Sequence, residues 1–510
     1  MCEYNNPHIF SFQDPRNPIM SLTILTADEL QNLEMRAANQ LGADTLMKRA
    51  GAAAAELIMK RLEDAGVEQR RVTLLVGPGN NGGDALACAC ELREKGAVVN
   101  VVLPGGRRPT SALALAQLER WTQAGGTTYD DPYMTEKADC VVDGLFGTGL
   151  AKPITGDYLD AVLWFNERQA LKVSLDIPSG LNPVTGHWTG SYPGCSADVT
   201  ITFLCVKSGL YMCEGADAAG EIVLNELDVS VPLSPLSVIG TDEFPRVLRP
   251  RVKNSHKGDY GSVAVIGGTD GMIGASILAA RAALISGAGR VTLECRAEHA
   301  PHVDMVYPEI MFATKPVNLE DFDAIVLGCG LGTSAEAKAR VIEALNCQKP
   351  LILDADALNI IAADIKLQDM VLARRAPTVL TPHPGEAARL LRRDTAGVTA
   401  DRVAACRELA VQTGAIVVLK GAGTVISMRS SRTWINPTGS PMLATGGSGD
   451  VLAGMIGAMF AQGYDMVESV LAAVYFHGLS AEGLEAGFTA GEIAPNAMAL
   501  VHDARVSYDL

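Results

Sequence analysis

The sequence lacks the features that would place it in a membrane or outside the cell. Its longest apolar runs fall short of the roughly 18 residues that a membrane-spanning helix requires. The first 20 residues lack a charged segment followed by an apolar core, which is the pattern of a secretion signal. The 11 cysteines include no C-x-x-C pair, and Cys88 and Cys90, two apart on a predicted helix, point to different faces, which argues against a shared metal. We therefore expect a non-exported, cytoplasmic protein whose cysteines are reduced core residues.

Positive charge is also scarce, because 42 basic residues stand against 58 acidic ones and leave a net charge of -16. The resulting field repels nucleic acids and anionic lipids, so we expect neither nucleic acid nor membrane as a partner. Any anionic ligand must be held by local groups. The 51 glycines exceed the usual share of about 7%, which is typical of a chain with several phosphate-binding loops.

Short β-branched runs alternate with amphipathic stretches along both halves of the 510 residues, which predicts two large α/β domains with parallel sheets. Four prolines between Val231 and Arg251 interrupt any regular pattern. We predict a loose arm over 1–20, a domain over 21–231, a linker over 232–251 and a domain over 252–510. The predicted strands are 72–76, 97–103, 140–142 and 173–175 in the first half and 262–266, 290–294, 324–327, 351–353, 378–380 and 416–419 in the second.

One segment of the second half has the strongest chemical signal. Gly446, Gly447 and Gly449 precede Asp450 and an apolar helical run over 451–461. Glycines let backbone N–H groups approach a phosphate, and a helix N-terminus attracts anions. The same terminus favours an ionised Asp450, which can accept a proton from an alcohol that attacks a nucleotide phosphate. The motif alone leaves a second interpretation open, a glycine-rich turn with the aspartate as helix cap.

Three polar, glycine-containing loops follow predicted strands of the first half. One covers 77–84, ahead of a helical pattern over 85–95. The other two begin with Asp143, before the glycine-rich run 144–149, and with Asp176. Each aspartate alone fits a turn, but the carboxyl ends of parallel strands share one crevice. Convergence of the three loops favours a nucleotide-type site.

These segments together carry a family resemblance. Residues 80–84, 143–149 and 176–180 resemble the epimerase domain of NAD(P)H-hydrate repair enzymes. Four further segments resemble the matching dehydratase domain, and the order is that of the fused bacterial form: 328–332, 381–386, 420–424 and 446–450. The resemblance implies an N-terminal Rossmann-like three-layer sandwich followed by a C-terminal ribokinase-like α/β domain.

The resemblance also implies a bifunctional enzyme, an isomerase and a lyase, that repairs hydrated NADH and NADPH. The first domain would interconvert the R and S hydrates at C6. The second would phosphorylate the C6 hydroxyl of the S form with ADP and release phosphate, although spacing does not separate ADP from ATP. The motifs leave open an alternative, a kinase for a vitamin or sugar alcohol fused to a non-catalytic nucleotide-binding module.

The resemblance assigns roles to single residues. Asp450 is the expected base of the dehydratase, and Asp176 is the expected proton shuttle of the epimerase. Asn81, Asp143 and Ser179 are similar to a potassium site. Magnesium is expected with the nucleotide, and a homo-oligomer is a further family expectation.

Other residues receive weaker assignments. Glu386 is a candidate to orient magnesium through water, whereas Asp354 and Asp356 fit either turn positions or contacts to substrate or metal. We interpret His477 as a buried core residue. The implied substrate contacts are Asn80, Asn81, Gly82, Gly83, Asp84, Gly147, Thr148, Gly149, Leu150, Ala151, Lys152, Pro153, Asp176, Ala275, Gly332, His383 and Asp450. The implied nucleotide contacts are Lys420, Gly421, Ala422, Gly423, Thr424, Gly446, Gly447 and Gly449.

Overall fold

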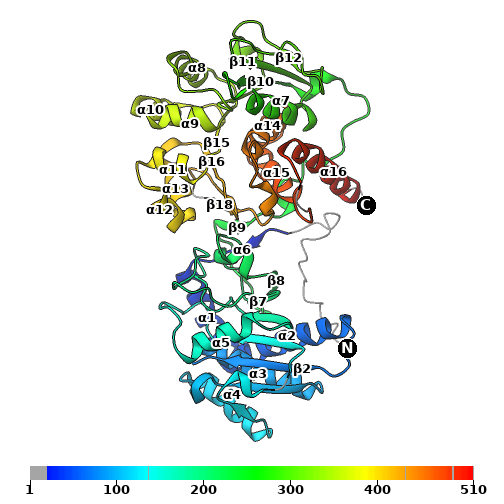
Figure 1. The fold of residues 1–510 in the computed structure, drawn as a ribbon, viewed down its shortest axis with the longest axis vertical. Helices are drawn as coiled ribbons and strands as arrows, with labels where there is room; N and C mark the ends of the chain where they lie inside the picture. The colour runs from blue at the N-terminus through cyan, green and yellow to red at the C-terminus, as the bar shows by residue number, and fades with distance from the viewer. Residues whose placement is uncertain (1–19, 136, 431, 485–486, 509–510) are drawn as a thin grey trace. The chain divides into compact units, whose positions relative to one another are not determined.

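The computed structural model describes residues 20–135, 137–430, 432–484 and 487–508, so the predicted arm over 1–20 lies almost wholly outside the described residues. The chain forms two compact units, one over Leu22–Ser234 and one over Pro235–Leu510 (Figure 1). Each unit has its own mainly parallel sheet. Within the described ranges, every helix is too short or too polar to cross a lipid bilayer.

The first unit contains a seven-stranded parallel sheet in the order β4-β3-β2-β5-β6-β7-β8. Alternate residues of β2 serve opposite faces, since Val72, Leu74 and Val76 join one apolar core and Leu75 joins the other. Helices α2, α3 and α4 cover the first core and α5 covers the second, which gives three layers. The strands are β1 (Leu22–Thr23), β2 (Arg71–Val76), β3 (Val98–Val102), β4 (Thr128–Tyr129), β5 (Cys140–Gly144), β6 (Leu171–Leu175), β7 (Val199–Phe203) and β8 (Glu221–Asn225), and the helices are α1 (Ala27–Leu41), α2 (Ala43–Asp64), α3 (Asn80–Glu94), α4 (Ala112–Gln123), α5 (Asp157–Asn166) and α6 (Gly215–Ala218).

Helix α3 begins at Asn80, so the prediction of a loop over 77–84 was wrong for its second part. The reason is close packing. A Cβ atom on Gly82 would lie 2.1 Å from the carbonyl oxygen of Gly77, and one on Gly77 would lie 1.6 Å from that of Leu145. Only glycines permit this tight turn from β2 into the helix. The predicted asparagines therefore lie on the first helical turn.

The second unit contains a longer sheet that includes the strands β9-β18-β17-β16-β15-β14-β13-β10-β11-β12 in this order. Strands β16 to β12 pair in parallel, and β17 runs antiparallel to both its neighbours. The chain order reverses where β10 lies between β11 and β13, which is the position at which α/β sheets bind ligands. The strands are β9 (Leu236–Val238), β10 (Ser262–Gly267), β11 (Arg290–Cys295), β12 (Met311–Phe312), β13 (Ala324–Leu327), β14 (Leu351–Leu353), β15 (Thr378–Leu380), β16 (Ile416–Leu419), β17 (Val425–Ser427) and β18 (Thr433–Ile435).

Helices cover both faces of this sheet, with α7, α14, α15 and α16 gathered on one side (Figure 1). Every residue of α14 from Val451 to Ala461 is buried. A Cβ atom on Gly454 would lie 2.2 Å from the carbonyl oxygen of Ala279 in α7, so the two helices cross at very close range. The helices are α7 (Ile273–Ile285), α8 (Ala335–Asn346), α9 (Ala355–Ala362), α10 (Ile365–Ala373), α11 (Pro384–Leu391), α12 (Thr395–Ala400), α13 (Arg402–Thr413), α14 (Ser448–Ala461), α15 (Met466–Leu479) and α16 (Ala490–Tyr508).

The segment 232–251, which the prolines predict as a linker, contains regular structure in the second unit. Its residues Leu236–Val238 form β9, which pairs in parallel with β18. Phe244, Val247 and Leu248 are buried. The prolines lie beside these contacts and not within the strand, so they do not prevent the pairing.

Candidate active sites

Asp450 lies on the first turn of α14, at the carboxyl edge of the second sheet. Burial, followed by the charge of Asp354, raises the pKa of Asp450 to about 6. The thiol of Cys329 completes this cluster, because the sulfur and one oxygen from each carboxylate all lie within 4.8 Å of one another. Asp450 therefore changes protonation close to neutral pH, as a general base must.

Asp354, whose role the sequence left open, is the buried partner of a lysine. Its Oδ1 atom accepts hydrogen bonds from Lys420 Nζ at 2.9 Å and from the Thr381 hydroxyl at 2.8 Å. Burial lowers the pKa of Lys420, but the charges of Asp354 and Glu386 outweigh it and leave the pKa above its usual value. Lys420 is therefore a fixed positive charge in this cluster.

The glycine-rich segment before Asp450 forms an open turn into α14. A Cβ atom on Gly446 would meet no other atom within 4 Å, whereas one on Gly449 would lie 3.0 Å from Lys420 Nζ. The turn thus combines accessible backbone, a helix N-terminus and a lysine, which suits a phosphate. Gly447 supports it with a left-handed φ of 94°.

His477 is buried, as predicted, and contacts the backbone of this turn. Its Nε2 atom lies 2.9 Å from the carbonyl oxygen of Ser448, which can only accept a hydrogen bond. Burial lowers the pKa of His477 to about 4, so the ring is neutral at pH 7 and donates from Nε2.

The predicted nucleotide loop 420–424 follows β16 and is held by Arg402, which sequence reasoning missed. Arg402 is buried and donates hydrogen bonds to the carbonyl oxygens of Ala422 and, at 2.9 Å, Gly423. A Cβ atom on Gly421 would lie 2.9 Å from the guanidinium carbon. Arg402 begins α13, far from the loop in sequence, and nothing in its surroundings marks it as a loop contact.

The predicted substrate residues of the second unit lie around this centre. Asp356 accepts a hydrogen bond from the backbone N–H of Gly332 at 2.8 Å, which fixes that turn. A Cβ atom on the neighbouring Gly330 would lie 3.2 Å from Cβ of Ala275, so the predicted contacts Ala275 and Gly332 come from adjoining segments.

His383 caps the N-terminus of α11 and is half exposed. The ring atom Nδ1 of His383 accepts a hydrogen bond from the backbone N–H of Gly385 at 3.0 Å. The backbone N–H of His383 donates to Glu386 Oε2 at 2.8 Å. Glu386 is buried, and burial raises its pKa although Lys420 opposes this shift. This reciprocal cap fixes the backbone of both residues.

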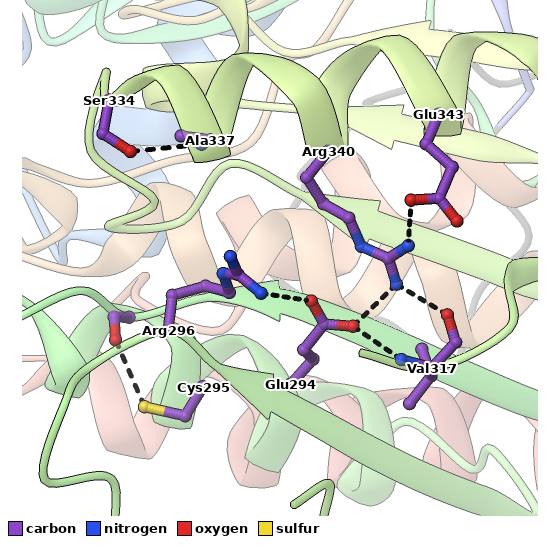
Figure 2. Close-up of polar contacts among 9 residues, drawn as sticks. Glu294, Cys295, Arg296, Val317, Ser334, Ala337, Arg340 and Glu343 are labelled. Carbon is purple, nitrogen blue, oxygen red and sulfur yellow. Dashed lines mark hydrogen bonds and ion pairs between the residues drawn. The ribbon is translucent and has the colours of Figure 1, made fainter. Parts of the chain in front are cut away.

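A buried ion-pair network anchors the helix that follows the Gly332 turn (Figure 2). Ser334 caps α8 through a hydrogen bond from the Ala337 N–H at 3.2 Å. Farther along α8, Arg340 donates to Glu294 Oε2 at 2.6 Å, and both side chains are buried. Arg296 adds a contact of 3.2 Å to Glu294 Oε1. The network therefore joins α8 to the end of β11 and supports one side of the site.

A pocket of about 790 Å³ lies at the carboxyl edge of the first sheet. Its wall includes most of the substrate contacts predicted for this unit, namely Asn80, Asn81, Asp84, Gly147, Thr148, Gly149, Leu150, Ala151, Lys152 and Asp176. Gly82 and Gly83 instead lie beneath it, where a Cβ atom on Gly83 would come within 2.5 Å of the Met47 side chain. Pro153 packs beside Gly190.

Asp176 pairs with Lys207, a second residue that sequence reasoning missed. Lys207 is 5% exposed, and its Nζ atom donates to Asp176 Oδ1, to the Thr202 hydroxyl at 2.9 Å and to the Phe203 carbonyl oxygen at 2.9 Å. These three contacts use all three protons of the ammonium group. The backbone of Asp176 is left-handed, with a φ of 66°.

Asp143 and Ser179 form a tight buried pair. The carboxylate accepts hydrogen bonds from the Ser179 hydroxyl at 2.6 Å, the Ser179 N–H at 2.8 Å, the Ser174 hydroxyl at 3.0 Å and the Leu145 N–H at 3.1 Å. By contrast, Asn81 is 7% exposed, and neither polar atom of its side chain has a hydrogen-bond partner among the described residues. A buried amide without hydrogen bonds destabilises the fold, and the two polar atoms of the Asn81 side chain are therefore available to a ligand.

Two family models match the chain. Residues 263–501 match the model described as NAD(P)H-hydrate dehydratase, and residues 43–209 match the YjeF-related protein N-terminus. A bifunctional NAD(P)H-hydrate repair enzyme of Coxiella burnetii is 35% identical over 501 residues, which cover 92% of this chain and 99% of that protein. The Escherichia coli enzyme of the same description is 34% identical, with 94% and 93% covered.

A crystal structure of an ADP/ATP-dependent NAD(P)H-hydrate dehydratase from Bacillus subtilis is 32% identical, covers 50% of this chain and 95% of that chain, and gives a TM-score of 0.45. The full-length relatives match both units in the same order. Each unit has the predicted α/β architecture, and the chain belongs to the family of bifunctional NAD(P)H-hydrate repair enzymes.

Proposed function

We propose that this chain repairs hydrated NADH and NADPH, with an epimerase in the first unit and an ADP-dependent dehydratase in the second. Family membership supports both activities. The observation that carries the dehydratase is the position of Asp450, which has a pKa of about 6 on the first turn of α14 and lies beside Asp354.

The substrate is a hemiaminal with a hydroxyl on C6, next to ring nitrogen N1. Hydroxide leaves poorly at neutral pH, so the hydroxyl must first become a better leaving group. Asp450 takes the hydroxyl proton as the oxygen attacks the terminal phosphate of ADP, and the α14 amides and Lys420 stabilise the transferring group. The N1 lone pair then expels phosphate from C6, and loss of a C5 proton restores the dihydronicotinamide.

Magnesium would lie beside the same cluster. Asp354 Oδ1 is occupied by Lys420 and Thr381, whereas Oδ2 accepts no hydrogen bond from any described residue. Carboxylate oxygens are the ligands that Mg²⁺ prefers, so Asp354 would hold the ion, with Glu386 reaching it through water. When bound, the ion offsets the charge of the nucleotide phosphates.

Potassium would lie in the first unit, where the buried side-chain amide of Asn81 has no hydrogen-bond partner among the described residues. One carboxylate, Asp143, together with neutral oxygens from Asn81 and Ser179, is a donor set that suits a monovalent cation. When bound, the ion offsets part of the charge of the substrate phosphates.

The chain would act in the cytoplasm as a homo-oligomer that does not bind nucleic acids. Every cysteine within the described ranges is a free thiol, which supports a reducing compartment. The net charge of -16 supports the exclusion of nucleic acid. The oligomer follows from the family resemblance, and light scattering of the purified chain tests it.

The test is incubation of the full chain with mixed epimers of hydrated NADH and either ADP or ATP. We expect recovery of the dihydronicotinamide absorbance together with release of inorganic phosphate. Asp450→Asn should lower this dehydration at least a hundredfold while the chain stays folded, because the amide cannot take the hydroxyl proton. Dehydration at the normal rate by this variant contradicts the assignment. A stable phosphorylated metabolite as product would instead favour the alternative kinase.

A further inference from the structure

Three carboxyl groups share the pocket of the first unit. Asp176 and Asp84 line its wall, and Glu34 joins them from α1 at the solvent-exposed rim. Lys207 is the buried cation of this group, and its three protons are used by Asp176, Thr202 and Phe203. The lysine that lines the wall itself, Lys152, is exposed. The pocket thus stabilises one carboxylate and leaves the other two without a fixed counter-charge.

Asp84 is the inner of these two groups. It lies on α3, and no described residue donates a hydrogen bond to its carboxyl group. Burial raises its pKa well above the ordinary value, the charges of Asp176 and Glu34 raise it further, and only Lys207 opposes them. The two carboxyl groups of this pocket thus have opposite surroundings, because Asp176 pairs with Lys207, whereas burial and neighbouring acids favour the protonated form of Asp84.

We propose that Asp84 is the catalytic acid of the epimerase and works with Asp176 as the base. The inference rests on the function proposed for this pocket and assigns to Asp84 a chemical step beyond substrate contact. Opening of a hemiaminal requires one group that takes a proton and one that gives a proton, and the wall of this pocket offers a lysine-paired carboxyl group and a second one without any hydrogen-bond donor among the described residues.

The step transfers two protons and breaks one ring bond. Asp176 takes the proton of the C6 hydroxyl, the oxygen electrons form a carbonyl group, and the C6–N1 bond breaks. Its electron pair goes to N1, which takes the proton of Asp84. The product is an open-chain aldehyde with an N–H group. Rotation about the C5–C6 bond presents the other face to N1, and closure returns both protons to their original carriers with C6 inverted.

The experiment uses the full chain with Asp450→Asn, so that epimer interconversion is followed without dehydration. Pure S hydrate is added, and the appearance of R hydrate is measured by chromatography for this variant with and without Asp84→Asn. The amide keeps the shape of a neutral carboxyl group but cannot transfer its proton. We expect kcat to fall about 10²- to 10⁴-fold, with KM changed less than threefold. The decline of the parent rate at high pH, caused by ionisation of Asp84, should disappear.

Glu94→Gln is the matched control, because Glu94 also lies on α3 but its side chain is 65% exposed and pairs with Arg120. It should leave kcat unchanged. Asp84→Ala with added formate is a second arm, in which a small acid should restore part of the rate. A normal kcat in Asp84→Asn, or a loss confined to KM, overturns the proposal. Failure of the parent chain itself to equilibrate the epimers would instead overturn the proposed function.

Discussion

Single residues determine the chemistry of both units through their immediate neighbours. Burial and the charge of Asp354 raise the pKa of Asp450 to about 6, whereas Asp176 forms an ion pair with Lys207. The sequence predicted both aspartates because glycine-rich turns and strand ends mark them. It could not predict Lys207 or Arg402, because a single basic residue forms no pattern until folding brings its partners to it.

The raised pKa of Asp450 predicts the pH dependence of dehydration. Asp450 must be ionised to accept a proton, so kcat/KM should fall about tenfold per pH unit below pH 6. A pH–rate profile of the full chain, from pH 4.5 to 8.5 at fixed ADP, measures it. The residual rate of Asp450→Asn should show no such decline. A profile that is flat between pH 5 and 7 would contradict the role of Asp450.

At the scale of elements, burial explains which predictions succeeded. Strands β13, β14, β15 and β16 were predicted with their observed bounds, because strands buried on both faces form uninterrupted apolar runs. The strands β7, β8, β9, β17 and β18 were missed. Tertiary pairing and not local pattern defines the short strands β9, β17 and β18, and Thr200 and Thr202 interrupt the apolar run of the buried strand β7. The start of α3 was missed because asparagine and glycine are weak helix formers, and close packing outweighs this preference.

The network of Figure 2 predicts that α8 depends on one buried carboxylate. Glu294→Gln removes the buried counter-charge of Arg340 and leaves it with the exposed Glu343 alone, so unfolding of the second unit should become easier by about 3 kcal/mol. Chemical denaturation followed by circular dichroism measures the change. Because α8 follows the Gly332 turn, KM for hydrated NADH should also rise.

Glu343→Gln provides the control for this prediction. Glu343 pairs with the same arginine, but its side chain is 59% exposed. Exposed ion pairs contribute about 1 kcal/mol or less, so this variant should be nearly as stable as the parent. Equal losses in the two variants would mean that the network does not support α8 through Glu294.

At the scale of the whole molecule, each of the two units has its own sheet, core and candidate site. The family resemblance predicted this organisation, whereas composition predicted only two α/β domains. The boundary was the least predictable part. A proline-rich segment appears as a linker in sequence, yet β9 and Phe244 pack into the second unit.

Because each unit has its own candidate site, we expect that two variants, each inactive in a different unit, restore complete repair when they are mixed. Asp176→Asn should dehydrate S hydrate but leave R hydrate to its slow spontaneous conversion, and Asp450→Asn should only interconvert the epimers. An equimolar mixture should restore complete repair of R hydrate in the absorbance assay. Each variant at twice the concentration is the control. A mixture no faster than either variant alone would show that the sites must share one chain.

Both units end a central strand in a similar manner. Asp176 after β6 has a φ of 66°, and Ala355, next to Asp354 after β14, has a φ of 48°. Such backbone is unfavourable for residues with a Cβ atom, and aspartate tolerates it better than alanine. A single residue with positive φ ends the alternation by which successive side chains of a strand point to opposite faces of the sheet. The chain can therefore turn away at the end of a buried strand, which leaves each aspartate at the sheet edge, Asp176 on the wall of the pocket and Asp354 beside Asp450.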